Sequence, residues 1–229
     1  MATSGTTTFD LDIDDIIQEA YERCGARTNS GYDLKSARRS LNILFSEWGN
    51  RGVHLWKVEL KEQLLTNGTA TYTAPTNAND ILEAYISTTT GTTSATNDVS
   101  LTKISRSEYA ALPNKGSTGQ PSQYYVDRQT IPQITLYQTP DASTYTYLKY
   151  YYLKRIEDAG AYTNTADVVF RFIPCMVAGL SYYLSMKYNP QVVQQNKLIY
   201  EDELQRALVE DGQRTSVYIT PQSYYPTGL

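Results

Sequence analysis

The amino-acid sequence predicts an α+β protein: a four-helix bundle formed by N- and C-terminal helix pairs, a central β-rich insertion and an extended C-terminal arm. Apolar residues recur every three or four positions near both ends of the 229-residue chain, which is typical of amphipathic helices. The middle is rich in Thr, Tyr, Ser and Asn and alternates over short runs, which is typical of strands. We expect the bundle in 10–52 and 165–212, the insertion in 53–164, and the arm in 213–229.

The first two helices are expected to pack as an antiparallel pair, because only a short loop separates them. The first should run from Asp12 to Gly25, with several aspartates near its positive N-terminal end and the glycine as its stop. The second should begin with Asp33 as N-cap and end at Gly49. The apolar stripe of the first helix consists of Ile13, Ile16, Ile17, Ala20 and Cys24.

Residues 46–59, SEWGNRGVHLWKVE, contain the only histidine and both tryptophans. Glycines can take positive φ where a helix ends, and the apolar period changes from helical to alternating at Val53. The second tryptophan is expected to enter the sheet. We interpret this stretch as a helix-to-strand joint rather than an active site. The residues of the joint are Trp48, Gly49, Gly52, His54 and Trp56.

Several short runs between 53 and 155 are separated by turn signals and predict strands. In the last run, TYTYLKYYYL, alternation places Lys149 and Tyr151 on one face and Leu148 and Tyr150 on the other. A short helix is expected at 104–112. Helical periodicity returns from Val168 to Lys187, where apolar groups on nearly all sides indicate a central helix, and again from about 190 to 211.

The sequence predicts no enzyme chemistry, no cofactor and no metal. His54 has no nucleophile motif around it, and no HExxH, paired CxxC, Walker A or GxGxxG pattern occurs. The aspartates near residue 12 lack the glycine and distal glutamate of a calcium loop, so we interpret them as a helix start. Cys24 and Cys175 lie in apolar helical patterns and are expected to be buried thiols.

The charge balance and hydropathy exclude two further classes. Twenty basic and 24 acidic residues give a net charge of −4, so no basic field favours nucleic-acid binding. The most apolar segment, FIPCMVAGLSYYL, is shorter than the roughly 20 residues that cross a bilayer. The polar opening MATSGTTTFD predicts no secretory signal. We expect a soluble protein made in a cytoplasm, without membrane contact.

Two segments are candidates for contact with other proteins. Lys35, Arg38 and Arg39 form a small basic group on the second helix, which is either a solvated face or a salt-bridging contact with an acidic neighbour. The final residues, GQRTSVYITPQSYYPTGL, are too polar for a core of their own. They are rich enough in β-branched and aromatic residues to lie extended against a partner.

Four stretches resemble the head-to-tail adaptor of short-tailed bacteriophages, of the head-completion or tail-tubular A type. They are IDDIIQEAYERCG, LKSARRSLNILFSEWGNRGVHLW, ISRSEYAALPNKGSTGQPSQYYVDRQ and RFIPCMVAGLSYYLSMKYNP with the acidic-basic helix after it. The resemblance spans roughly residues 10–212. It implies a non-enzymatic protein of the virion neck, in which a dodecameric ring docks on the portal, joins it to the tail nozzle and helps retain packaged DNA. DNA would then be a passing cargo in the channel.

This resemblance implies interface residues rather than a catalytic site. Candidates for contact with the portal or a neighbouring copy are Lys35, Arg38, Arg39, Val217, Tyr218, Ile219, Tyr224 and Tyr225. Candidates for the tail-side partner are Asn114, Lys115 and Gln120, in the loop 113–121. A β-rich receptor- or glycan-binding module of the tail is the alternative, since the Thr and Tyr content of the central region would also suit it.

Overall fold

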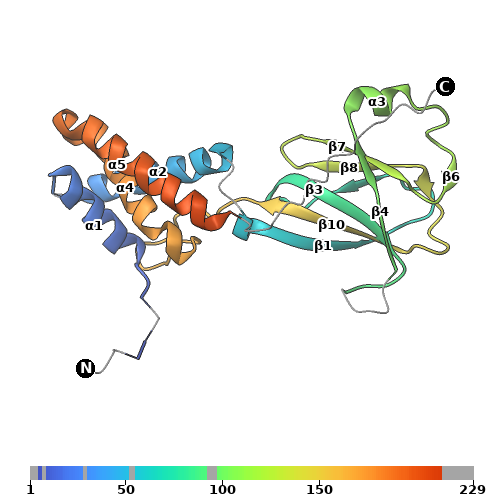
Figure 1. The fold of residues 1–229 in the computed structure, drawn as a ribbon, viewed down its shortest axis with the longest axis horizontal. Coiled ribbons are helices and arrows are strands. Elements are labelled where there is room, and N and C mark those ends of the chain that lie inside the picture. Colours follow the sequence, from blue (N-terminus) through green and yellow to red (C-terminus); the bar gives the residue numbers. More distant parts are fainter. Residues whose placement is uncertain (1–4, 7–8, 28–29, 52–54, 92–96, 213–229) are drawn as a thin grey trace, which may run out of the picture.

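The protein has a helical half and a β half joined side by side (Figure 1). The fold is that of a computed structural model, which describes residues 5–6, 9–27, 30–51, 55–91 and 97–212. Two hydrophobic cores lie within it. One core consists mainly of residues from the two ends of the described chain, and the other consists of residues from the strands in the middle. The predicted arm, 213–229, lies outside the described residues.

The helical half contains four α-helices arranged around one of them. α4 is buried on nearly every side and packs against the other three, which contact α4 more than they contact one another. Short 3-10 turns, η2 (Phe170–Phe172) and η3 (Pro190–Val192), precede the last two helices. The helices are α1 (Ile13–Cys24), α2 (Gly31–Arg51), α4 (Ile173–Tyr188) and α5 (Val193–Asp211).

The predicted four-helix bundle is wrong. The described chain is α+β, with five α-helices and three sheets, and its fifth helix, α3 (Arg106–Ala111), lies in the β half. In a bundle each helix buries one stripe against two neighbours. Here α4 is apolar nearly all round, so α1, α2 and α5 are all needed to cover it. The central position that the sequence indicated for this helix therefore excludes the bundle.

Local signals set some helix ends, and tertiary contacts set others. Gly25 ends α1 in the left-handed conformation, with φ of 71°, as predicted. α2 starts two residues before the predicted cap, because Ser30 donates to the carboxylate of Asp33 from both its backbone N–H and its hydroxyl. At its other end α2 continues through Gly49 to Arg51, so the predicted stop at Gly49 is wrong.

The β half consists of two four-stranded sheets and one two-stranded sheet. The first sheet has the order β1 (Val58–Leu64), β10 (Tyr147–Lys154), β3 (Ala78–Ser87), β4 (Asp98–Ser100), all antiparallel. The second has the order β2 (Thr71–Thr73), β8 (Gln133–Tyr137), β7 (Gln123–Asp127), β5 (Thr102–Ile104), with β5 and β7 parallel. The third pairs β6 (Thr118–Gly119) with β9 (Thr139–Pro140).

Side chains from both four-stranded sheets form the core of the β half. β10 contributes Leu148 and Tyr150, which alternate with residues on the outer face, as the sequence predicted. One outer residue, Lys149, is only 2% exposed. Its ammonium donates to the carbonyl oxygen of Gly91 and, at 3.2 Å, to the carboxylate of Asp98. A buried charge needs such partners, so Lys149 brings Gly91 and Asp98 together on the outer face of the sheet.

Trp56 belongs to the helical core. It lies in the 3-10 turn η1 (Leu55–Lys57), and its ring centroid is 4.7 Å from that of Phe172. The first strand starts only at Val58. The prediction that Trp56 enters the sheet is therefore wrong, because the ring that it packs on comes from more than 100 positions further along the sequence.

The returning segment, residues 155–169 between β10 and the last two helices, forms hydrogen bonds with both α1 and α2. The backbone N–H groups of Ile13 and Asp14 donate to carbonyl oxygens within this segment, at 2.9 and 3.0 Å. Asn42 of α2 accepts from the N–H of Ala159 at 2.7 Å. The buried ammonium of Lys57 pairs with Asp167. These contacts hold the returning segment against the helical half at several points.

Candidate interaction surfaces

A polar network ties α2 to α4 and α5 inside the helical half. The indole N–H of Trp48 donates to the hydroxyl of Tyr200 at 3.0 Å, and that hydroxyl donates to Glu47 at 3.2 Å. Tyr183 donates to the same carboxylate at 3.0 Å, and Arg51 pairs with it at 2.6 Å. Burial and the nearby Glu47 carboxylate raise the pKa of Tyr183 to about 12 and also raise the pKa of Tyr200. Both phenols are therefore neutral donors.

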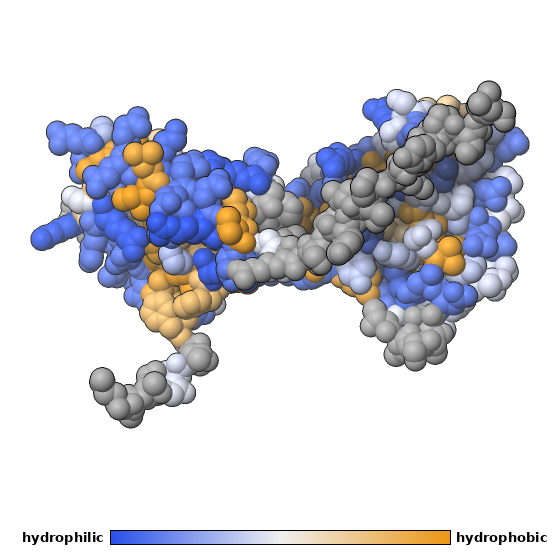
Figure 2. Space-filling view, viewed as in Figure 1, coloured by the Kyte–Doolittle hydropathy of each residue, from blue (hydrophilic) through white to orange (hydrophobic). Residues whose placement is uncertain are grey.

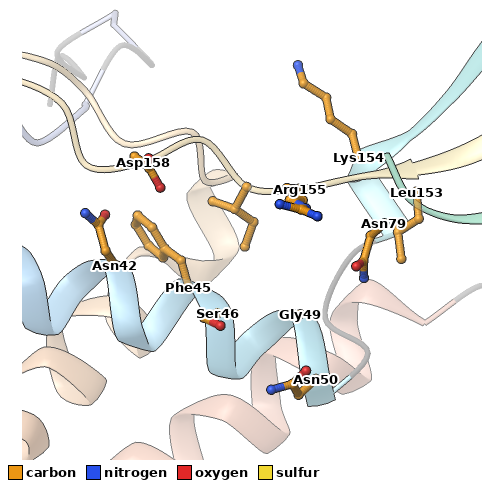
Figure 3. Close-up of a pocket in the computed structure, with 11 residues that line it drawn as sticks. Asn42, Phe45, Ser46, Gly49, Asn50, Asn79, Leu153, Lys154, Arg155 and Asp158 are labelled. Carbon is orange, nitrogen blue, oxygen red and sulfur yellow. The ribbon is translucent and has the colours of Figure 1, made fainter. Parts of the chain in front are cut away.

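A cleft of about 290 Å³ lies where the two halves meet (Figure 3). α2 supplies one wall, with Asn42, Phe45 and Asn50. The segment that leaves β10 supplies the opposite wall, with Arg155 and Asp158. The lining is mixed and carries no set of converging donors. We interpret this cleft as part of the joint between the halves.

The three basic residues predicted as an interface group do not share one environment. Arg38 is half-buried, donates to the carbonyl oxygen of Gly160 at 3.1 Å, and lies over the ring of Tyr162, 5.3 Å from its centroid. Its guanidinium therefore fastens α2 to the returning segment. Lys35 and Arg39 are exposed. Only these two are placed to meet another molecule.

An exposed stripe runs along the outer side of α2. We call it the α2 stripe; it consists of Tyr32, Lys35, Arg39 and Ile43. Their spacing of three and four residues places them on one face, opposite the buried Leu41 and Leu44. Two of the four are apolar and well exposed, Tyr32 at 70% and Ile43 at 50%. Near the stripe, burial lowers the pKa of Lys187, and the charge of Arg39 lowers it further.

A groove of about 460 Å³ lies on α1 and the start of α4. We call it the α1/α4 groove. Its apolar lining includes Phe9, Pro174 and Val177, and the exposed Asp15 and Glu22 also line it. Phe9 is 64% exposed and contacts Phe170, which is 70% exposed, edge to face, with ring centroids 6.5 Å apart. Figure 2 shows apolar surface at this edge of the helical half, where the N-terminal segment leaves it.

The predicted tail-side loop lies at the end of the β half farthest from the helices, next to α3 and β6 (Figure 1). Asn114 and Gln120 are exposed, and Asn114 takes a positive φ of 48°. The ammonium of Lys115 donates to the carbonyl oxygen of Ala110 at 2.9 Å and lies 5.3 Å from the ring centroid of Tyr109. Lys115 therefore stabilises the end of α3, which leaves two of the three predicted residues available to a partner.

Several predicted residues lie outside the described part of the chain. They are Gly52, His54, Val217, Tyr218, Ile219, Tyr224 and Tyr225. Their roles stay predictions. Of the predicted joint, Trp48 is fully buried, whereas Gly49 is half-buried within α2.

Both cysteines are buried, as predicted, and burial raises the pKa of each thiol. Within the described ranges, no group of three His, Cys, Asp or Glu side chains is placed to hold a metal ion. No helix among those residues is long and apolar enough to cross a membrane.

Sequence reasoning missed the α1/α4 groove, because its walls come from segments more than 150 positions apart. The signal that could have found it is Phe9, an aromatic residue in the otherwise polar opening of the chain. It also missed the burial of Lys149, because a lysine in an alternating strand is normally a solvent-facing residue.

The sequence profile of the SU10 adaptor protein family matches residues 5–223, almost the whole chain. The chain therefore belongs to the SU10 adaptor protein family, and it is a structural adaptor of a bacteriophage. A comparison with curated proteins gives no match. The family confirms the resemblance at the level of a phage adaptor.

Proposed function

We propose that this adaptor forms a ring that joins the portal to the tail in the neck of the virion and helps retain packaged DNA. The family match over residues 5–223 carries the proposal, because it extends through both halves of the molecule. The helical segments 10–52 and 165–212 would act as one domain and 53–164 as an inserted one. The two separate hydrophobic cores support two domains, and Trp56 and Ala159 at the two ends of the insertion pack in the core of the helical domain.

The arrangement of surfaces supports a bridging role. Lys35 and Arg39 are exposed on the helical half, and Asn114 and Gln120 are exposed at the far end of the β half (Figure 1). A protein that bridges two partners needs contact surfaces at separated places. In this proposal the helical half meets neighbouring copies and the portal, and the loop after α3 meets the tail nozzle protein. A dodecamer would match a twelvefold portal.

The test is the mass of the purified full chain, measured by light scattering, alone and mixed with the portal protein of the same phage. We expect the mixture to move to the mass of a portal plus a ring. A mixture that keeps the two separate masses at high concentration contradicts the proposal. A glycan array probed with the same preparation would then test the alternative, a β-rich receptor-binding module.

Deletion of residues 213–229 tests the predicted arm. We expect the shortened chain to keep the circular dichroism spectrum of the full chain, because both described cores lie before residue 213. Portal binding should weaken, since the arm would lose its extended contact with the portal or a neighbour. Unchanged portal binding would remove the arm from the proposal.

A further inference from the structure

The helical half carries two unlike surfaces, the basic α2 stripe and the acidic α1/α4 groove. We propose that the α2 stripe of one copy docks into the α1/α4 groove of a second copy, so that successive copies join head to tail. This inference rests on the ring-forming part of the proposed function and names the two surfaces that would meet.

The α2 stripe has the composition of an interface rather than of a solvated helix face. It combines two well-exposed apolar side chains, Tyr32 and Ile43, with two cations, Lys35 and Arg39. Within the part of the chain that the structure describes, neither cation forms an ion pair. Aromatic residues and arginine, both present in the stripe, are enriched at protein interfaces.

The α1/α4 groove offers the complementary chemistry. Its apolar lining, with Phe9, Pro174 and Val177, could pack against the tyrosine and isoleucine of the stripe. Its rim is acidic. Glu19 is already paired with Arg23 at 2.8 Å, whereas Asp15 and Glu22 are exposed and form no ion pair among the described residues. In the proposed contact, Asp15 and Glu22 of one copy would therefore form ion pairs with Lys35 and Arg39 of the next.

The two surfaces lie on opposite sides of α4. Gly179 of α4 faces α2 and α5, because a side-chain atom there would come within 2.9 Å of Leu44 and of Tyr200. Val177, two residues earlier, lines the α1/α4 groove. Residues two apart on a helix point roughly 200° apart. A stripe and a groove on opposite sides cannot meet within one copy, but they can join one copy to the next.

The contact would be heterologous, since the two faces differ. Heterologous contacts build closed rings or open filaments, whereas an isologous contact stops at a dimer. Like charges would also oppose pairing of stripe with stripe or of groove with groove. The charge pattern therefore favours one direction of assembly.

A charge swap in the full chain tests this contact. The stripe variant is Lys35→Glu with Arg39→Glu, the groove variant is Asp15→Lys with Glu22→Lys, and the swapped variant carries all four changes. We expect the stripe and groove variants each to weaken self-association roughly tenfold or more, because like charges then face each other. The swapped variant should recover most of the loss. Lys61→Glu with Arg106→Glu, two exposed cations on the β half, is the matched control and should associate like wild type.

The readout is the mass of each variant by light scattering, alone and on the portal, with circular dichroism to check folding. Folded stripe and groove variants that associate like the control overturn the inference, and so does a swapped variant that stays as weak as its parents. Wild-type chains that stay monomeric both alone and on the portal also overturn it. If wild type self-associates but ignores the portal, the portal-binding proposal fails, while the swap still decides the contact between copies.

Discussion

The helical half and the β half differ in how much apolar surface they leave uncovered. Nine of the twelve large apolar side chains exposed in the described residues belong to the helical half. They include Phe170, Leu198 and Val209, each at least 70% exposed. The β half exposes only Leu64, Leu82 and Tyr151. Phe9 and Phe170 form one contiguous exposed apolar patch. Such patches mark places where partners bind, so we expect another molecule to cover this part of the helical half.

Buried tyrosines of the two halves also differ in their polar partners. In the helical core the hydroxyl of Tyr200 links Trp48 to Glu47. In the core of the β half Tyr124 donates to the carbonyl oxygen of Leu82, whereas the hydroxyl of Tyr150 has no partner among the described residues. Tyr150 therefore acts only as a large apolar side chain. The following four predictions compare the two halves.

Trp48→Ala should have the largest effect, a loss of about 3–5 kcal/mol in the free energy of unfolding, because it empties a fully buried site in the helical core. Urea unfolding followed by helical circular dichroism measures it. Leu136→Ala, a buried truncation in β8, is the counterpart in the β half. If Trp48→Ala shifts only the unfolding of the helical half and Leu136→Ala only that of the β half, the two halves unfold separately. If either change shifts the unfolding of both halves, the protein unfolds as one cooperative unit, which contradicts the proposed division into domains.

Gly179→Val should cost up to about 3 kcal/mol, since even the first added carbon would lie 2.9 Å from Leu44 and Tyr200, both fully buried. Gly49→Val is the matched control, because a side chain there meets open space within the same helical half. We expect the control to change the free energy of unfolding by less than about 0.5 kcal/mol. Equal effects of the two changes in thermal unfolding would show that α4 does not pack closely on α2 and α5.

Tyr200→Phe should cost about 1–2 kcal/mol, because it leaves the buried indole N–H of Trp48 without its acceptor. Tyr150→Phe removes a hydroxyl that forms no hydrogen bond in the described structure, so stability should stay unchanged or rise slightly. Urea midpoints of the two variants give the comparison directly. A larger loss for Tyr150→Phe than for Tyr200→Phe would contradict the difference between the two hydroxyls.

The smallest of the four effects should come from acid, which lowers the free energy of unfolding of the helical half by protonating Glu201. Hydrogen bonds from Arg51 lower the pKa of Glu201 below its ordinary value of 4.5. A carboxylate with a lowered folded-state pKa contributes stability above pH 4.5, and this contribution is lost as the pH falls through the folded-state value. Glu201→Gln should therefore flatten the fall of helical stability below about pH 4.5. In the β half, Glu59→Gln should do the same, since the hydroxyl of Tyr152 lowers the pKa of Glu59. An acid profile that neither change alters would contradict both assignments.

Much of the secondary structure was predictable, because it depends on neighbours in the sequence. The apolar stripe of α1, its stop at Gly25 and the two faces of β10 follow from spacing and from glycine's tolerance of positive φ. The candidate surfaces were less predictable. Lys35, Arg38 and Arg39 look alike as a sequence, but Arg38 is held by a carbonyl oxygen 122 positions away.

The sequence by itself determined the α+β class, the burial of both cysteines and the central position of the helix around residue 180, since each follows from composition and local periodicity. Only the tertiary structure decided that α4 is surrounded by three helices, that Trp56 packs on Phe172, and that α1, α4 and the segment before α1 line one groove, with no residue of the α2 stripe in its lining. Those outcomes depend on contacts between segments far apart in the chain, whose geometry no local pattern encodes.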